Sequence, residues 1–218
     1  MYNSRKYILN ENYFKKIQVQ EQAYLLGLLL SDGYLYEKEY KVGLTSIDKS
    51  LILFLKDNLQ ATNPIAERQF KVGNLCYEIS LNSKILFYDV LKYRQHILKK
   101  EVLHIPNEIP KEFMHHFIRG YFDADGCIRL KNNKKQLNFD IASYENILKE
   151  IAFYIDTNIN KKKKTKILPH GNIHRINYAG NIQCYKIYKY LYQNAHLYLQ
   201  RKKDIFENMF AKRQMVNY

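Results

Sequence analysis

Two segments of the chain each contain an apolar run that ends in an acidic residue followed by glycine. They are EQAYLLGLLLSDG at residues 21–33 and PKEFMHHFIRGYFDADG at residues 110–126. Their length and composition predict two buried helices. Pro110 suits the first turn of the second helix. Gly33 and Gly126 are expected to cap the helix ends in the left-handed conformation that glycine adopts at least cost.

The hydrophobic pattern after each of these segments repeats. A hairpin with alternating apolar positions follows first, and next come an amphipathic helix, a second hairpin with a Gly-Asn turn, a closing helix and a basic stretch. In the first half these elements span 34–46, 48–60, 65–81, 82–94 and 96–101, and in the second half 127–143, 144–156, 164–180, 181–193 and 197–204. The core-facing positions are expected at Val42, Leu44, Leu51, Leu55 and Leu59, and at Leu137, Phe139, Ile141, Ile147, Ile151 and Ile155, with turns at Gly73-Asn74, Asn132-Asn133 and Gly171-Asn172.

This repeat predicts an α+β fold of two pseudo-symmetric αββαββα halves. Each half would hold a four-stranded sheet with helices on one face, and together the halves would form mixed, saddle-shaped sheets with a free face. The stretch HIPNEIPKE at 104–112 holds two of the four prolines and best marks the seam. The halves are therefore placed at residues 1–104 and 105–218.

Small residues four positions apart mark one face of each apolar helix. Gly27 precedes Ser31 and Gly120 precedes Ala124 by one helical turn. A glycine inside a helix costs about 1 kcal/mol relative to alanine, so a compensating interaction is expected. Close packing of the two helices at the centre of the molecule, around a pseudo-twofold axis, would supply it.

That packing would bring Asp32 and Asp125 together, 93 positions apart in sequence. Both carboxylates would lie at the negative ends of helix dipoles, and like charges raise each other's pKa. A divalent cation resolves the conflict, and oxygen ligands without nearby cysteine or histidine favour Mg²⁺, with Mn²⁺ as a substitute. The alternative is that Asp-Gly is only a common turn, which two matching contexts disfavour.

The balance of charge points to a polyanionic partner. Lys and Arg number 35 against 21 Asp and Glu, a formal net charge of +14, which favours nucleic acid. No apolar run reaches the roughly 18 residues of a membrane span, and no lipidation signal is present, so no membrane partner is expected. Three scattered cysteines, Cys76, Cys127 and Cys184, indicate a reducing, intracellular compartment. An AT-rich genome is an alternative origin of the Lys, Asn, Tyr and Ile content.

The segments LLGLLLSDG (25–33) and IRGYFDADG (118–126) resemble the two motifs of LAGLIDADG homing endonucleases, and the resemblance extends over about residues 20–210. It implies a single-chain, monomeric enzyme with both motifs in one polypeptide. The resemblance assigns the metal site to Asp32 and Asp125, completed by the carbonyls of Ser31 and Ala124, and helix packing to Gly27 and Gly120.

The first motif departs from the family pattern. Leu30 stands where the first acid of the motif often stands, whereas Asp123 keeps that acid in the second motif. The two DNA strands are therefore expected to be cut at different rates. The resemblance also implies a basic catalytic residue after the last helix of each half. Its candidates are Lys99 or Lys100 and Lys202 or Lys203, of which Lys100 and Lys203 are preferred.

Outward-facing strand positions are expected to read base edges in the major groove of DNA, as antiparallel ribbons can. The expected contacts are Tyr36, Lys41, Thr45, Gln69, Lys71, Arg129, Lys131, Gln136, Asn138, Arg175 and Asn177, with Glu67, Glu78, Ser80 and Asp140 on the same faces. The run Lys161–Lys164 and the basic stretch 201–203 are expected to hold phosphates.

The resulting hypothesis is a site-specific double-strand DNA endonuclease of the kind that mediates intron homing. It would hydrolyse phosphodiesters across the minor groove of a long target with bound metal. An intron RNA maturase or a non-cleaving DNA-binding regulator on the same scaffold is the first alternative, with intron RNA as a further partner; the retention of both acids favours the nuclease. An intein nuclease domain is disfavoured because no splicing residues flank the chain, and a basic α/β protein without enzymatic activity is the last alternative.

Overall fold

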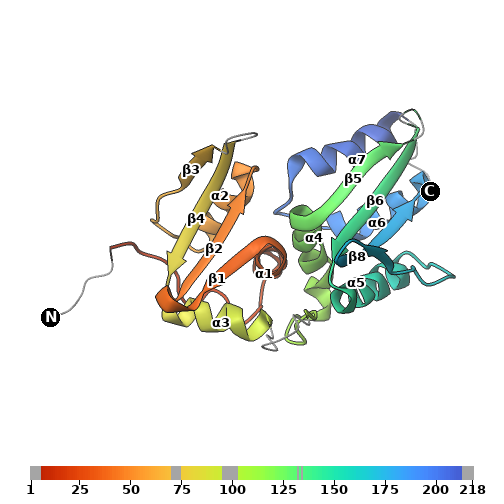
Figure 1. The fold of residues 1–218 in the computed structure, drawn as a ribbon. Helices are drawn as coiled ribbons and strands as arrows, with labels where there is room; N and C mark the ends of the chain where they lie inside the picture. Colours follow the sequence, from red (N-terminus) through yellow and green to blue (C-terminus); the bar gives the residue numbers. More distant parts are fainter. Residues whose placement is uncertain (1–5, 70–74, 95–102, 132, 134, 213–218) are drawn as a thin grey trace.

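Two helices lie side by side at the centre of the molecule, each leading into its own sheet (Figure 1). The structure is a computed structural model and describes residues 6–69, 75–94, 103–131, 133 and 135–212. The central helices are α1 (Gln20–Asp32) and α4 (Met114–Asp125). They are the two apolar segments of the sequence, so the prediction of paired central helices is confirmed.

The elements around the central helices repeat in order. After α1 come β1 (Gly33–Tyr36), the short 3-10 helix η1 (Glu37–Glu39), β2 (Lys41–Ser46), α2 (Lys49–Asn58), β3 (Ala66–Gln69), β4 (Leu75–Asn82) and α3 (Lys84–Arg94). The 3-10 helix η2 (Lys111–Phe113) precedes α4, which is followed by β5 (Gly126–Lys131), β6 (Gln136–Ser143), α5 (Glu145–Asn158), β7 (Leu168–His170), β8 (Ile173–Ala179), α6 (Asn181–Tyr192) and α7 (Gln200–Lys212). Helix α7 is an addition to the expected repeat, because the sequence pattern predicts only a basic stretch at 197–204.

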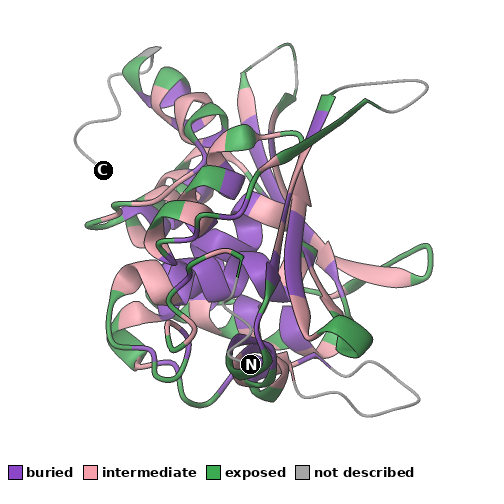
Figure 2. Ribbon diagram, turned by 90° about the vertical axis from the view of Figure 1, so that its left-hand side faces the viewer, coloured by how far each residue is buried: buried purple, intermediate pink, exposed green. Residues whose placement is uncertain are grey.

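The two sheets have the same topology, with strand orders β1-β2-β4-β3 and β5-β6-β8-β7. Every pairing between the described strands is antiparallel, so the expectation of mixed sheets is wrong in this respect. Helices pack against one face of the sheets and leave the other face uncovered (Figure 2). The alternating apolar positions predicted for β2 and β6 all lie in the core. The boundary between residues 104 and 105 stays a prediction.

Gly27 and Gly120 make the contact between α1 and α4 possible. A Cβ placed on Gly27 would lie 2.1 Å from the main-chain oxygen of Phe117, and one on Gly120 would lie 1.9 Å from that of Tyr24. Each glycine thus faces the carbonyl three residues before the other glycine, which is the reciprocity that a pseudo-twofold axis requires. Only glycine leaves room for such close backbones.

The glycines at the helix ends act differently from the expectation. Gly33 has φ −72° and Gly126 has φ −80°, both extended, so neither is a left-handed cap. Both instead start a strand directly from a helix. A Cβ on Gly33 would lie 2.4 Å from the Leu29 oxygen, and one on Gly126 would lie 2.0 Å from the Phe122 ring. Glycine is required there for space.

The turn predictions divide between described and undescribed residues. Gly171 has φ +59°, which suits the β7–β8 turn, and Asn133 has φ +53° between β5 and β6. Gly73-Asn74 and Asn132 lie outside the described residues. In the part of the chain that the structure describes, no helix has the length and apolar character to cross a membrane.

Candidate active site

Asp32 and Asp125 are the last residues of α1 and α4, and their carboxyl groups are in hydrogen-bonding contact. The reciprocal helix packing places them there, because equivalent turns of the two helices meet. Ser31 adds a link by donating its hydroxyl to Asp125 Oδ2 at 2.7 Å. Partial burial, followed by the charge of Asp125, raises the pKa of Asp32 to about 7. The two acids therefore form a strained pair in the absence of a cation.

This pair fits a hard divalent cation. Within the described ranges, no group of three or more His, Cys, Asp or Glu side chains gathers as a metal site. Two carboxylates alone suit Mg²⁺, which keeps several waters and takes its remaining ligands from substrate phosphates. The carbonyls of Ser31 and Ala124 directly precede the acids and are the further oxygen donors available at this place.

Asp123, the other acid of the second motif, does not belong to this pair. It is 1% exposed, inside the protein. Its Oδ2 accepts hydrogen bonds from Tyr24 Oη at 2.9 Å and from the main-chain N–H of Leu199 at 2.8 Å. Burial raises its pKa, and the nearby Lys202 opposes this shift. Asp123 thus joins both central helices to the segment that leads into α7, whereas the matching position in the first half is the buried Leu30.

Of the two candidate lysines in the second half, Lys202 lies against the motif helix. Its ammonium donates to the carbonyls of Phe122, Asp123 and Gly126 at 2.6, 2.9 and 2.6 Å. These carbonyls form the negative end of α4, so Lys202 neutralises the helix terminus that carries Asp125. Burial lowers the pKa of Lys202 to about 8. At 3% exposure it cannot reach a phosphate directly.

Lys203, the preferred catalytic candidate, has a different environment. Its ammonium pairs with Glu207 at 3.5 Å and lies over the Tyr198 ring. The structure therefore favours Lys202 as the residue next to the acids. Lys99 and Lys100, the candidates in the first half, lie outside the described residues.

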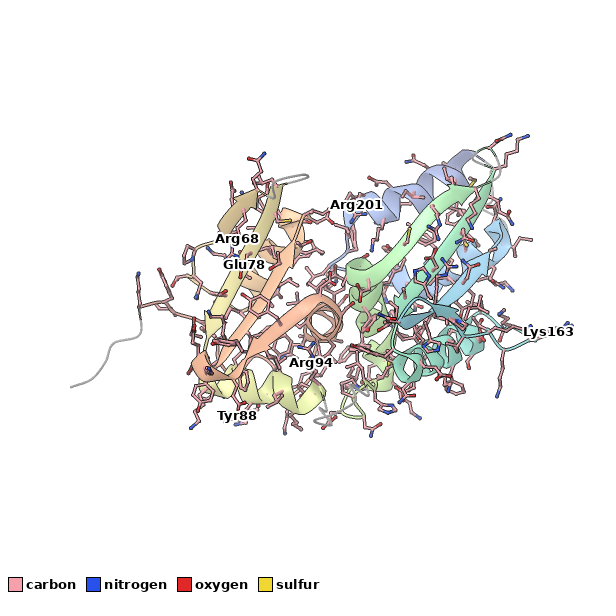
Figure 3. The ribbon with its side chains drawn as sticks, viewed as in Figure 1. Arg68, Glu78, Tyr88, Arg94, Lys163 and Arg201 are labelled. Carbon is pink, nitrogen blue, oxygen red and sulfur yellow. The ribbon has the colours of Figure 1, made fainter. Side chains whose placement is uncertain are left out.

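Arg94 is a functional candidate that the sequence analysis missed. It ends α3 and donates Nη1 to the carbonyl of Gly33 at 3.3 Å. Gly33 occupies the place of Gly126, so Arg94 approaches the end of α1 in the way that Lys202 approaches the end of α4 (Figure 3 labels Arg94). A basic residue at the end of the closing helix was visible in the sequence, but it was passed over for the lysines that follow.

The uncovered face of the first sheet carries most, but not all, of the residues predicted for it. Strand β3 is shifted by one residue: Ala66 pairs with Glu78 and Arg68 with Cys76. Glu67 and Gln69 therefore face the helices, and Glu67 pairs with Lys49 at the start of α2. Gln69 was thus assigned to the wrong face. The residues on the uncovered face are Tyr34, Tyr36, Lys41, Gly43, Thr45, Ala66, Arg68, Cys76, Glu78, Ser80 and Asn82.

The uncovered face of the second sheet agrees with the predicted alternation. Arg129, Lys131, Gln136, Asn138, Asp140, Arg175 and Asn177 share it. Asn138 is 2% exposed, however, and donates its amide to Asp140 at 3.1 Å. It supports its neighbours and is not free to meet a base, contrary to the expectation. Lys71, expected on the first sheet, lies outside the described residues.

The comparisons with known proteins agree with this geometry. A family model described as "LAGLIDADG-like domain" matches residues 112–191, which include α4 and the second sheet. The homing endonuclease I-DmoI of Desulfurococcus mucosus is 30% identical over 141 residues, which cover 56% of this chain and 66% of I-DmoI. The chain belongs to the LAGLIDADG homing endonuclease family.

Other matches show how far this relationship extends. The NrdEB alpha subunit of ribonucleoside-diphosphate reductase from Bacillus subtilis is 26% identical over 192 residues, covering 74% of this chain but only 17% of that subunit. The solved structure of homing endonuclease I-WcaI bound to its DNA recognition sequence has a TM-score of 0.58 and 16% identity, covering 90% of this chain and 91% of I-WcaI. Full-length DUF199/WhiA from Thermatoga maritima has a TM-score of 0.54 and 12% identity, with 96% and 66% covered. At these identities the structural likeness concerns the fold.

The expected phosphate contacts of this LAGLIDADG protein are only partly available. Lys162, Lys163 and Lys164 are exposed on the loop before β7, and Lys163 projects from the outer side of the second half (Figure 3). Arg201 instead forms a two-pronged pair with Asp48, at 2.6 to 3.1 Å, and so joins α7 to the first half. Arg201 and Lys202 therefore link parts of the protein, and a role of the stretch 201–203 in holding phosphates stays a prediction.

Proposed function

We propose that this protein is a site-specific double-strand DNA endonuclease that depends on a divalent cation, Mg²⁺ or Mn²⁺. The observation that carries the proposal is the contact between Asp32 and Asp125 at the ends of two helices that glycine packing holds together. The family membership, the net charge of +14 and the uncovered sheet faces support DNA as the substrate. We infer that a single chain, with one half on each half-site, forms the active unit.

The chain's own residues have separable roles in this proposal. Asp32 and Asp125 would hold the metal, with the carbonyls of Ser31 and Ala124 as further donors. A bound divalent cation would activate water and stabilise the leaving oxygen. Ser31 orients the Asp125 carboxylate, and Lys202 and Arg94 bind the carbonyls around the helix ends that carry the acids. The uncovered faces of the two sheets would bind the duplex on the two sides of the acid pair.

A cleavage selection tests this function. Purified protein is incubated with Mg²⁺ and a large duplex library, and the ends of broken molecules are sequenced. Asp32→Asn and Asp125→Asn should abolish breaks while DNA binding persists. Asp57→Asn is the matched control, since this exposed acid on α2 changes charge equally without touching the site. Specific breaks that survive in the Asp32→Asn/Asp125→Asn double variant would refute the assignment of the site.

DNA binding without cleavage is the second candidate function, as a regulator or an RNA maturase. A similar fold occurs in WhiA, whose name does not describe a nuclease, and this supports a non-cleaving function as the second candidate. Selective retention of duplexes with no breaks in Mg²⁺ or Mn²⁺ would support this candidate over the nuclease.

A further inference from the structure

Each uncovered sheet face carries one arginine paired with a nearly buried carboxylate. Arg68 Nη2 lies 2.7 Å from Glu78 Oε2, and Arg129 Nη2 lies 2.7 Å from Asp140 Oδ2. The arginine side chains are 67% and 42% exposed, whereas the acids are only 13% and 8% exposed. The two guanidiniums therefore lie above their carboxylates, on the faces that the proposed function assigns to DNA (Figure 3 labels Arg68 and Glu78).

A second donor fixes each carboxylate. Tyr34 donates its hydroxyl to Glu78 and also contacts Ser80 Oγ at 2.7 Å. Its ring lies over Gly43, where a Cβ would come within 2.1 Å of the ring. On the other sheet, Asn138 donates its amide to Asp140. The acids are thus held in place before any ligand arrives.

Two lysine pairs on the surface look different, whereas the Arg201–Asp48 pair, with an arginine 53% and an acid 17% exposed, has the same asymmetry and joins α7 to the first half. In the Lys41–Glu39 and Lys49–Glu67 pairs, the acids are 52% and 51% exposed. Withdrawing a carboxylate from water costs free energy that an ion pair does not reliably return. Stability alone is therefore a weak reason for Glu78 and Asp140 to be buried, whereas orientation of the arginines is a good one.

The chemistry of such a pair favours reading a base over binding a phosphate. A carboxylate cancels the charge that would attract a phosphate, but it leaves most of the five N–H groups of arginine free and directed. Guanine offers O6 and N7 as adjacent acceptors in the major groove, and arginine is their commonest partner. An oriented arginine on an uncovered antiparallel sheet suits that contact.

We propose that Arg68 and Arg129 are specificity-determining residues that each read a guanine, one in each half-site, and that Glu78 and Asp140 are positioning residues for them. This inference rests on the proposed function. Arg129 lies on β5, the strand that starts at the end of α4, so its guanine belongs to the inner part of the target. Arg68 lies on β3, the far edge strand of the first sheet, so its guanine belongs to the outer part of the other half-site.

A binding selection tests the inference separately from cleavage. The full chain is used to enrich duplexes from a randomised library, and base preferences are read by sequencing. Arg68→Gln should reduce discrimination for guanine by about tenfold or more at one outer position, and Arg129→Gln should do the same at one inner position of the opposite half-site. Arg68→Ala should shift the base preference at the target position that Arg68 contacts from guanine toward cytosine. The Glu78 carboxylate, freed from its arginine, would accept a hydrogen bond from the cytosine amino group.

Two further variants distinguish positioning from bulk stability. Glu78→Gln should weaken the preference at the Arg68 position and leave the other positions unchanged, which a general loss of stability would not do. Arg201→Gln is the control, since it removes a carboxylate-paired arginine that lies off the sheet faces. Thermal unfolding shows that each variant is folded.

The outcomes separate the two levels of inference. A target motif whose guanine positions ignore Arg68 and Arg129 would overturn this inference and leave the proposed function intact. The absence of any sequence enrichment would overturn both. Loss of preference at all positions together in folded Glu78→Gln protein would overturn the positioning role.

Discussion

Gly27 and Gly120 face each other across the α1–α4 contact, each against the main chain of the opposite helix. A methyl group on either would lie about 2 Å from a carbonyl oxygen, and backbone cannot yield as a side chain can. We predict that Gly27→Ala or Gly120→Ala lowers the free energy of unfolding by about 3 kcal/mol or more, at the upper end of overpacking effects. Magnesium affinity should fall as well, because the helices separate and carry Asp32 and Asp125 apart.

Gly171→Ala is the control for that prediction. Nothing lies within 4 Å of a Cβ at this turn, but φ is +59°. We expect a loss of about 1 kcal/mol from conformational strain, without an effect on magnesium affinity. Denaturant titration and calorimetric metal titration check both quantities. Unchanged metal affinity in Gly120→Ala would show that the acids do not depend on the helix contact.

The second prediction concerns pH. The folded protein without metal holds a proton on Asp32 up to about pH 7, whereas the unfolded chain loses it near pH 4. Between these values the folded state binds more protons, so this group's contribution to stability is present at low pH and is lost as pH rises through about 7. In Asp32→Asn this decrease in stability with rising pH should be absent. Magnesium competes with the proton and should raise the melting temperature more at about pH 8 than at about pH 6.

Thermal unfolding with and without magnesium, in wild type and in Asp32→Asn, measures this linkage. Asp57→Asn should behave like wild type. If magnesium raised the melting temperature of the wild-type protein equally at both pH values, the proton and magnesium would not compete at Asp32.

The third prediction separates the two lysines at the start of α7. Lys202→Met removes a buried ammonium that serves three carbonyls and lies near the buried Asp123. We expect a loss of about 3 kcal/mol, because the oxygens and the carboxylate stay buried without a donor or counter-charge. Lys203→Met removes a partly exposed pair with Glu207 and should cost less than about 1 kcal/mol. Urea denaturation of both variants gives the comparison, and equal effects would be inconsistent with the helix-end role of Lys202.

The sequence was sufficient to predict the elements because local patterns set them. Alternation placed Val42, Leu44 and Phe139 in the core, and the small residues at Gly27 and Gly120 indicated the helix contact. The prediction failed at the ends of the central helices. The extended conformation of Gly33 follows from the direct passage of α1 into β1, and the nearby Leu29 carbonyl explains the need for glycine there. A helix that ends in glycine reveals neither.

The candidate site shows the same division. The adjacency of Asp32 and Asp125 followed from internal symmetry, whereas the roles of Lys202 and Arg201 depend on where α7 packs, which no local pattern encodes. Gln69 was assigned to the wrong face because β3 is short and exposed throughout. Alternation without a buried face cannot fix register.

The fourth prediction follows from the unequal motifs. Asp123 accepts hydrogen bonds from Tyr24 and from the N–H of Leu199, and it does not join the pair of Asp32 and Asp125. Asp123→Asn keeps an acceptor for these donors and should cost about 1 kcal/mol. Asp123→Leu leaves both donors without an acceptor and removes the carboxylate near the buried Lys202, and it should cost about 3 kcal/mol. Because Asp123 is not proposed to hold the metal, the folded Asp123→Asn protein should still cleave DNA, unlike Asp125→Asn. Equilibrium denaturation and cleavage of a selected target measure the two effects. A stable Asp123→Asn protein that binds DNA but does not cut it would instead place this carboxylate in the catalytic machinery.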